Sequence, residues 1–600
     1  MTIFNTVAAL QAATLTAGQI VRTKGYTAAG DGGHGDYLTV AGDSSNGLDK
    51  LLLGNGNTAE LMNPEIADIR AFGIIGDGVT DDTAKIQGVI NLGFPVLNTG
   101  DVRLVFKVSR LTGRGNIKIT GNGTFDFSSN ADYAATFSDP LIPFIGTAGS
   151  AILLTADANN EDLTLTVAST ADLSEGDIVE LATPTDNGGF MDTSIVVANG
   201  ELFEVLSIDS GTQITLTTHV MDLNGYTVVN GAQIRKITTL DNITIGKDIT
   251  IKGKGRDAAD VSGDIGLFFQ FCRNVKVHCN LDGVDARGVF FSSCYEYKAT
   301  HMRVTTNVES ANTKVNYGVS PADSSKFGEI AYNEFHNMRH AVVSSHLGGL
   351  LANTYGVSRM TNVHHNKSYN TWHAAYATHQ DAELIFFDHN EATDCTFGVN
   401  IRERRMKARN NKLVNCGQDI YLTGEPTKCL IQGNEGYGGG YLLTVSFATS
   451  FDMDDMSIVG NRKFGGIGGI SLICPTAVTS NKNLLLIDNE ILGIDGAGGN
   501  DAGIRVEGHL LRPVINRNTV NGVSNGVGIR VIAVTSITDG EINGNVVREV
   551  SGRAYQFSAN YVNVYAKYNS AKGFGGSFMS GSGNLANSST VLSDNTDMGA

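Results

Sequence analysis

Asparagine returns at a constant place in a pattern that repeats through the second half of the chain. The pattern is a short strand, an Asn or Gly, a second short strand and a turn, and it runs from about residue 242 to residue 569. The asparagines that align its frames are Asn333, Asn366, Asn390, Asn411, Asn434, Asn489, Asn518 and Asn545. The first five are 33, 24, 21 and 23 residues apart. Repeats of this length predict a solenoid, in which each coil contacts only its neighbours.

Composition and side-chain alternation favour a parallel β-helix as the form of this solenoid. The 600 residues include 72 Gly and only 9 Pro, a balance typical of a regular fold with many tight turns. Within one frame, Val399 and Ile401 are predicted to point inward, and Asn400 and Arg402 outward. Asparagine suits the repeated position because it tolerates left-handed backbone geometry and can hydrogen-bond to its counterpart in the next coil. Leucine-rich repeats are a weaker alternative, since their helical half is missing.

Charge and apolar patterning exclude several functional classes. The net charge is −17 and no segment is basic throughout, so nucleic acid is not an expected partner. No apolar run approaches the roughly 20 residues of a membrane span, and the first residues lack the features of a secretory signal. The seven Cys form no CxxC pair, so we expect them to be small buried apolar residues. We expect neither a metal nor another cofactor.

Residues 68–92 depart from the repeat and predict a helix. Gly76-Asp77-Gly78-Val79-Thr80-Asp81-Asp82-Thr83 precedes a run with apolar residues at helical spacing. Thr80 is a suitable N-cap, and an Asp pair suits a helix N-terminus. We expect this helix to cap the open first coil of the solenoid, where unpaired strand edges would otherwise be exposed.

The same motif resembles the start of the pectate-lyase-like β-helix domains of bacteriophage tailspikes. Residues 18–26 and 30–37 resemble the small N-terminal module of many tailspikes and depolymerases. The resemblance implies a right-handed, single-stranded parallel β-helix that assembles as a homotrimer. It also implies attachment to the phage tail or baseplate through the N-terminus, location in the virion, and action at the bacterial surface on capsule or O-antigen polysaccharide. The step from fold to function here is one of analogy.

Five segments are predicted along the chain. They are a neck or attachment module (1–67), the capping helix with the first coils (68–149), an inserted small β-domain (150–240), the main β-helix with a glycan groove (241–570), and a Gly-, Ser- and Asn-rich tail (571–600). Alternating runs at 163–167 and 176–181 predict antiparallel hairpins in the insert. The insert would either widen the glycan-binding surface or brace neighbouring subunits.

One stretch, residues 339–425, places catalytic types of side chain on successive frames. Seven residues after the frame asparagines come His340, His373, Phe397 and Gln418. Thirteen residues after them come His346, His379, Glu403 and Gly424, preceded by Ser345, Thr378, Arg402 and Thr423. Tyr376 and Tyr421 share position ten, which is expected to face outward. Stacked coils would join these residues into one wall.

This wall supplies the candidate site residues. The candidate catalytic residues are His379, His346, Tyr376, Arg402, Glu403 and Asp381. The candidate substrate-binding residues are Trp372, His373, Tyr421, Arg404, Arg405 and His340. His379 is the first choice for general base or acid, with Tyr376 or His346 as its partner. Arg402 would hold a sugar carboxylate or the developing enolate, and Glu403 or Asp381 would orient an imidazole or act directly.

Two reaction classes remain open, with β-elimination slightly favoured. Elimination on a uronic-acid-containing glycan needs a cation, a base and an acid, for which Arg, His and Tyr are suited. Glycoside hydrolysis needs two carboxylates, for which Glu403 and Asp381 are plausible partners. A metal site built from His346, His379 and Asp381 is a lesser alternative. A tail fibre that only binds glycan and a secreted lyase of plant polymers are the rival functions.

Overall fold

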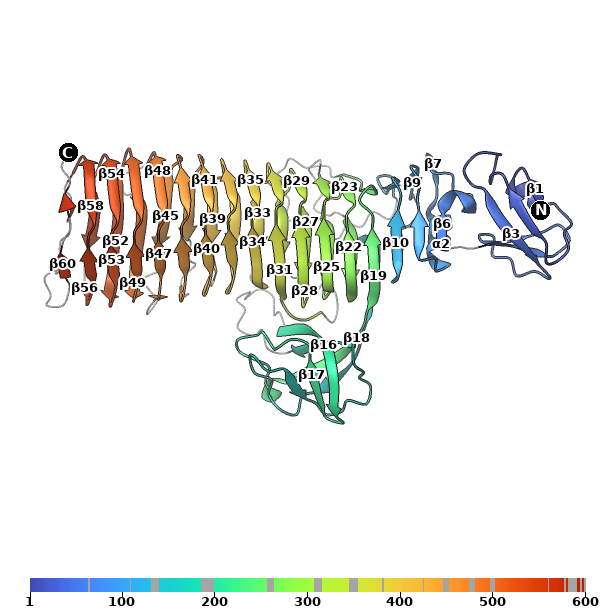
Figure 1. Ribbon diagram of the computed structural model, residues 1–600, viewed down its shortest axis with the longest axis horizontal. Coiled ribbons are helices and arrows are strands. Elements are labelled where there is room, and N and C mark those ends of the chain that lie inside the picture. The colour runs from blue at the N-terminus through green and yellow to red at the C-terminus, as the bar shows by residue number, and fades with distance from the viewer. Residues whose placement is uncertain are drawn as a thin grey trace. The chain divides into compact units, whose positions relative to one another are not determined.

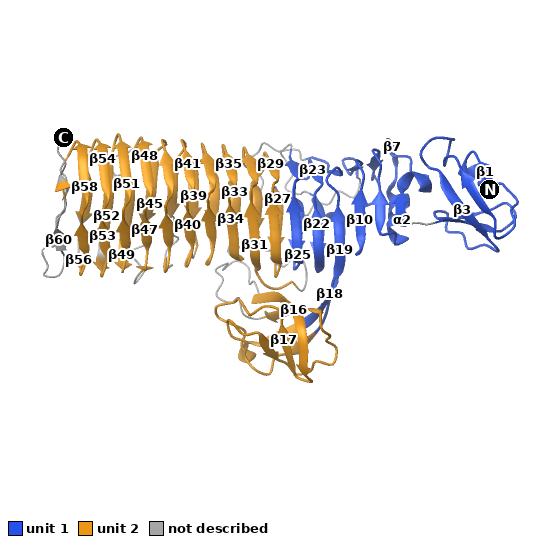
Figure 2. Ribbon diagram, in the orientation of Figure 1, with its two compact units in different colours: residues 1–150, 235–316 blue, residues 151–234, 317–600 orange. Residues whose placement is uncertain are grey.

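The computed structural model divides the chain into two compact units. One comprises residues 1–150 and 235–316, the other residues 151–234 and 317–600 (Figure 2). The structure describes residues 1–62, 65–107, 109–130, 140–184, 199–255, 264–306, 316–344, 354–379, 382–424, 426–445, 453–473, 481–496, 502–558, 561–576, 579–580, 591–593 and 596–597. Among these, no helix is long and apolar enough to cross a membrane.

The first unit begins with a small mixed sheet. Its strands are β1 (Thr2–Phe4), β2 (Ile20–Thr23), β3 (Gly35–Val40), β4 (Lys50–Leu52) and β5 (Thr58–Leu61), in the order β1-β2-β3-β5-β4. β1 pairs with β2 in parallel, and the other pairs are antiparallel. Helix α1 (Val7–Gln11) contributes Val7 and Leu10 to the core beneath this sheet.

The predicted helix is present but starts later than expected. It is α2 (Thr83–Asn91), with Asp82 at the N-cap position, so the prediction that Thr80 caps it is wrong. Thr80 instead lies in β7 (Asp77–Asp81), where its hydroxyl donates to the carboxylate of Asp77 at 2.8 Å. Ile86, Val89 and Ile90 form the buried face of the helix.

In the first unit, residues of the same type lie above one another on successive coils. β12 (Pro140–Ile145), β21 (Ile265–Gln270) and β24 (Arg287–Ser292) pair in parallel, placing Phe144, Phe269 and Phe291 in one column. Their ring centroids are 4.9 and 5.4 Å apart, with nearly parallel planes. Each coil therefore continues the hydrophobic core of the one before it.

The second unit contains a parallel β-helix built from three long sheets (Figure 1). The strands of sheet 1 are β27 (Tyr317–Ala322), β30 (His340–Ser344), β33 (Ala374–Thr378), β36 (Phe397–Ile401), β39 (Gln418–Leu422), β42 (Tyr441–Val445), β45 (Gly468–Ile473), β49 (Ala502–Leu511), β52 (Val527–Thr538), β55 (Tyr555–Ser558) and β59 (Met579–Ser580). The strands of sheet 2 are β28 (Lys326–Ala331), β31 (Ser358–His364), β34 (Ala382–Asp388), β37 (Lys407–Arg409), β40 (Leu430–Gln432), β43 (Ser457–Val459), β47 (Leu485–Ile487), β50 (Val514–Asn516), β53 (Glu541–Asn543), β57 (Tyr565–Lys567) and β60 (Val591–Ser593). The strands of sheet 3 are β29 (Glu334–His336), β32 (Lys367–Tyr369), β35 (Glu391–Thr393), β38 (Lys412–Val414), β41 (Glu435–Tyr437), β44 (Arg462–Phe464), β48 (Glu490–Ile494), β51 (Thr519–Val523), β54 (Val546–Val550), β58 (Ser570–Phe574) and β61 (Thr596–Asp597).

The frame asparagines form a continuous buried ladder between sheets 2 and 3. The backbone N–H and side-chain amide of each Asn donate to the side-chain oxygen of the next, at 2.8–3.1 Å. The ladder runs through Asn333, Asn366, Asn390, Asn411, Asn434, Asn461, Asn489, Asn518, Asn545 and Asn569. The predicted hydrogen bond between coils is confirmed. The left-handed residue, however, is the one before each Asn, as at His365 (φ 54°) and His389 (φ 52°).

The ladder predicts a large stability effect for a small substitution. Asn411→Ala removes the acceptor of the Asn390 N–H and amide groups and the donor to the Phe387 carbonyl. Each buried polar group left without a partner costs about 1–3 kcal/mol. We expect the thermal unfolding midpoint to fall by several degrees. The exposed Asn525→Ala, which removes one amide contact to Asp495 at 3.2 Å, is the matched control and should leave the midpoint nearly unchanged.

The inserted β-domain is an antiparallel sheet with its own core. β15 (Ile178–Thr183), β16 (Asn199–Ser210), β17 (Gln213–Leu216) and β14 (Thr164–Thr166) pair in that order. Side chains such as Leu165, Phe203 and Ile214 fill its interior. Figure 1 shows this domain beside strands β28 and β31 of sheet 2.

Two smaller features of the sequence have clear positions. The six Cys within the described residues are all free and buried, as expected for small apolar side chains: Cys272, Cys279, Cys294, Cys395, Cys416 and Cys429. Within the Gly- and Ser-rich tail, the described strands β59, β60 and β61 pair with β55, β57 and β58. These parts of the tail therefore extend the three sheets.

Candidate functional site

The coil that begins at Asn366 is one residue longer than its neighbours at the entrance to sheet 1. His340 pairs with Ala374, and Ala374 with Phe397, whereas the frame count aligns His340 with His373. A shift of one residue moves the following side chains of a strand to the opposite face. This extra residue changes which of the predicted site residues meet.

Six rings from neighbouring strands form one connected group, here called the aromatic patch. Its members are Tyr317, His340, His373, His379, Phe397 and Tyr421. The His340 ring centroid lies 4.9 Å from that of His373 and 5.9 Å from that of His379. Phe397 and Tyr421 stack with centroids 4.7 Å apart and planes 8° apart, which suits the apolar face of a sugar ring.

His340 has its tautomer set by the backbone. Its Nδ1 lies 2.9 Å from the carbonyl oxygen of Ala374, and because a carbonyl only accepts, Nδ1 carries the proton. The buried Nε2 is then an acceptor, and no described residue donates to it. Burial holds the pKa of His340 well below its ordinary value, helped by His379, His373 and Arg339.

His373 lies near two arginines. Burial, with Arg339 and Arg402 nearby, lowers the pKa of His373 to about 4. The Arg339 guanidinium also lies 5.7 Å from the Trp372 ring centroid and 6.0 Å from that of Tyr317. Neutral imidazoles and two permanent cations therefore share this part of sheet 1, an arrangement that favours an anionic ligand.

His379 and Arg402 occupy equivalent places on successive coils. Ala377 pairs with Asn400, and each of the two residues lies two positions further along its chain. The backbone N–H of Arg402 donates to the Thr378 hydroxyl at 3.0 Å, which holds the two chain segments together past the ends of their strands. The sequence frame placed His379 over Glu403 instead. The extra residue of the Asn366 coil is the cause of this difference.

Trp372 extends the site onto the turn before β33. Its indole lines a shallow pocket of about 480 Å³ with Asp394, Thr396 and Asn415. The Thr396 hydroxyl donates to the Trp372 carbonyl at 2.9 Å and so ties two coils at this point. An indole among hydroxyl, amide and carboxylate groups is a common composition for sugar binding.

The prediction that Tyr376 faces outward is wrong. The side chain is fully buried, and its hydroxyl donates to the Asn366 carbonyl at 2.9 Å and the Glu391 carbonyl at 2.8 Å. Tyr376 pairs with Val399, a core position, whereas Tyr421 pairs with Asn400. The one-residue shift therefore separates two tyrosines that share a frame position.

Arg404 and Arg405 contact acidic groups instead of joining the aromatic patch. Their guanidiniums each lie 3.3 Å from the buried carboxylate of Glu383, and Arg405 donates to the Met221 carbonyl at 2.7 Å. Arg404 also lies 3.6 Å from Asp222 of the insert. The chain turns after β36 toward sheet 2, which directs these two side chains to the insert.

A buried charge network surrounds that contact. The Arg359 guanidinium is 2.8 Å from Asp222, 2.9 Å from Glu383 and 2.9 Å from the Gly200 carbonyl. Lys326 contacts Glu201 of the insert at 3.3 Å. These pairs hold the insert against sheet 2, so it is a fixed part of the second unit.

The remaining predicted residues divide into buried and undescribed ones. Glu403 is 1 % exposed. His346 and Asp381 lie outside the described residues. Tyr317 and Arg339 belong to the site but were missed as candidates. Tyr317 could have been found from its position one coil before His340, because residues at equivalent places on successive coils pair with each other.

The low pKa values of His340 and His373 predict a pH-dependent stability. An unfolded histidine takes up a proton near pH 6.5, whereas these two remain neutral in the fold to lower pH. The unfolded state then binds more protons, so stability is present above pH 6.5 and is lost as the pH falls toward 4. We expect the unfolding free energy to depend on pH with a slope that corresponds to the uptake of up to about two protons on unfolding. Unfolding of a His340→Gln/His373→Gln variant should show a flatter slope, and the exposed His389→Gln should not.

The three sheets define a parallel β-helix protein with a cationic, imidazole-rich aromatic patch on one sheet. The tailspike gp61 of Pseudomonas phage phi297 is similar to this chain with a TM-score of 0.56 and 15% identity, covering 88% of this chain and 84% of that one. The tailspike protein gp49 of Pseudomonas phage LKA1 gives a TM-score of 0.55 and 15% identity over 87% and 84%. No family model and no curated protein sequence matches the chain. The expected resemblance to tailspikes is thus confirmed at the level of the fold.

Proposed function

We propose that this chain is a phage tailspike that binds an acidic polysaccharide of the bacterial surface and cleaves it by β-elimination. The observation that carries the proposal is the meeting of three imidazoles and two arginines with stacked Phe397 and Tyr421 on neighbouring strands of sheet 1. The tailspike fold of the similar structures supports the biological setting. The chemistry of the aromatic patch supports the reaction.

The proposed reaction uses the chain's own residues. Arg402 and Arg339 bind the carboxylate of a uronic acid residue, which makes the hydrogen on the adjacent ring carbon more acidic. His379, which is partly exposed, takes that proton. The electron pair of the C–H bond forms the ring double bond, and the bond to the neighbouring sugar oxygen breaks. The leaving oxygen takes a proton from the Tyr317 hydroxyl, which replaces Tyr376 in this role; His346 is the other candidate.

Hydrolysis has less support in the described residues. It needs two carboxylates on either side of the scissile bond. Glu403 is buried, and Glu383 is surrounded by Arg359, Arg404 and Arg405. Asp381 and Glu425 lie outside the described residues.

The test is incubation of the protein with purified capsules or O-antigens from a panel of bacterial hosts. Shorter polymer with ultraviolet-absorbing unsaturated ends supports elimination. Shorter polymer with new reducing ends and no such absorption selects hydrolysis. Binding without any change in polymer length leaves a non-catalytic fibre and overturns the enzymatic part of the proposal.

We also infer that the β-helix is right-handed and that the chain forms a homotrimer, which is attached to the phage tail through its N-terminal module. Helix α2 would cap the first coil. Large apolar side chains such as Ile473, Val562 and Tyr565 are exposed in the second unit. Side-by-side association would remove such surface from water. Sedimentation equilibrium should give three times the 63.5 kDa mass of the chain, and a monomer at micromolar concentration would contradict the inference.

A further inference from the structure

A second group of cationic side chains lies on sheet 1, several coils beyond the aromatic patch. Arg505 of β49 and Arg530 of β52 are directly opposite each other, and Gln556 of β55 follows Arg530 on the next strand. Neighbouring strands are about 4.8 Å apart. The repeated Gly-Ile-Arg-Val sequence thus places two guanidiniums, then an amide, in one column.

Both arginines contact a single carboxylate. The Glu507 side chain lies 2.8 Å from Arg505 and 3.2 Å from Arg530, and all three are largely buried. Like charges directly opposite each other on a sheet are unfavourable, so this column is stabilised by negative charge. Burial also lowers the pKa of the Arg530 guanidinium, with Glu507 acting against this effect.

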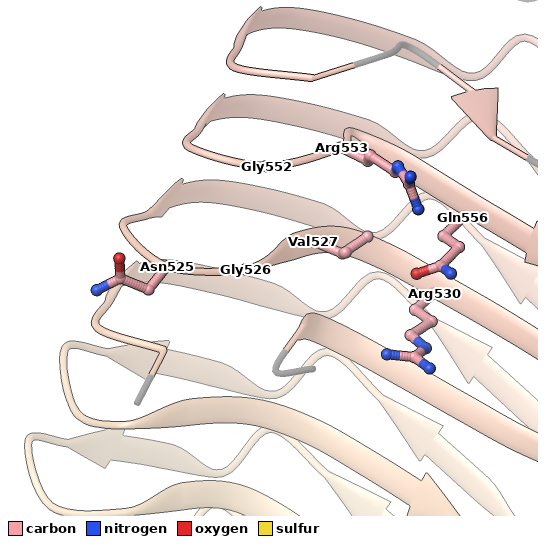
Figure 3. A pocket seen from close by; sticks show the side chains of 7 residues that line it. All are labelled: Asn525, Gly526, Val527, Arg530, Gly552, Arg553 and Gln556. Atoms are coloured by element: carbon pink, nitrogen blue, oxygen red, sulfur yellow. The ribbon is translucent and has the colours of Figure 1, made fainter. Parts of the chain in front are cut away.

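Arg530 opens onto a pocket of about 400 Å³, a size in the range of about 300–1,000 Å³ typical of small-ligand sites. Arg553 and Gln556 line the same pocket, and Figure 3 shows Arg530 on one coil and Arg553 and Gln556 on the next. Gly526 and Gly552 lie in two stacked turns beside it. A Cβ at Gly552 would lie 2.3 Å from the Gly526 carbonyl oxygen, so the close stacking of these turns requires glycine.

We propose that this pocket is a binding subsite for the carboxylate of an acidic sugar, with Arg530 as its main ligand. Arg530 pairs with the carboxylate, the Gln556 amide donates to it or to a ring hydroxyl, and Arg553 contributes charge at the exposed edge. Glu507 is a competing anion that limits the affinity. The identity of the ligand as a sugar acid rests on the proposed function; the site itself rests on this geometry.

The test measures occupancy at this pocket alone. Phenylglyoxal modifies exposed arginines, and peptide mass spectrometry reads Arg553 and the exposed Arg548 of β54 separately. The probes are digalacturonate and its neutral methyl ester. We expect the acid, and not the ester, to protect Arg553, while Arg548 reacts equally in both. Equal protection of Arg553 by acid and ester would overturn the proposal.

Two variants separate binding from folding. Arg530→Gln should raise the concentration of digalacturonate needed for protection by about tenfold or more, since a charge-assisted hydrogen bond contributes about 1.5–3 kcal/mol. Glu507→Gln should lower that concentration, whereas a purely structural role for Glu507 predicts a weaker or unfolded site. Unchanged protection in Arg530→Gln contradicts the proposal. Protection requires no cleavage, so the subsite can be found in a protein that fails to depolymerise any capsule, and cleavage can be found without the subsite.

Discussion

Replacing His379 with Gln should reduce the rate of polysaccharide cleavage about 10²–10⁴-fold, the contribution typical of a general acid or base. Glutamine keeps similar size and hydrogen-bonding capacity but cannot take a proton from carbon. His379 is half-buried at the end of β33, where its backbone N–H donates to the Ser344 carbonyl at 3.0 Å. The backbone contact survives the substitution, so the loss should appear in kcat with little change in glycan binding. The measurement is the initial rate of appearance of unsaturated ends from the capsule that the wild type degrades.

The matched control is His389→Gln. His389 is exposed on the turn between β34 and β35, next to Asp388 and stacked on His365, and belongs to no part of the aromatic patch. The His389→Gln protein should cleave the polysaccharide at the wild-type rate. A His379→Gln protein that retains more than a tenth of the wild-type rate would remove His379 from the proposed reaction. His373 or His340 would then need the same test.

Replacing Arg359 with Met should destabilise the second unit by about 3–5 kcal/mol, because removing one partner leaves buried charge uncompensated. Met preserves much of the side-chain volume, so the effect isolates the charge. Asp222 and Glu383 each lose a contact under 3 Å, and the Gly200 carbonyl loses its donor. We expect a lower unfolding midpoint and, under native conditions, faster proteolysis within residues 151–234, because the insert loses its central attachment.

Arg517→Met is the control for the same change of side chain. Arg517 forms a two-point ion pair with Asp488 at 2.7 and 2.8 Å, but both groups are exposed. Exposed pairs contribute about 0–1 kcal/mol, so this variant should unfold close to the wild type. Equal midpoints for Arg359→Met and Arg517→Met would show that the buried network does not hold the insert.

The repeat itself was readable from sequence because its physical requirement is local and periodic. A buried asparagine ladder needs the same residue at the same place in every coil, so the spacing of Asn366, Asn390 and Asn411 reveals the coils. Inward-facing residues such as Val399 and Ile401 are likewise set by strand alternation, and both are fully buried. The resemblance of residues 76–83 to tailspike sequences pointed to the same fold.

Which side chains come together in the site depends on register and long-range packing. One extra residue between Asn366 and β33 moves Tyr376 into the core and brings His379 level with Arg402, and frame counting from asparagines does not detect such a shift. Docking of the insert brings Asp222 to Arg404 and the Met221 carbonyl to Arg405, although both partners are far away in the chain. The periodic pattern of the sequence is sufficient to define the coil and the side chains available to it. Register within each coil and contacts between distant segments, which depend on the packed chain as a whole, decided which of those side chains meet.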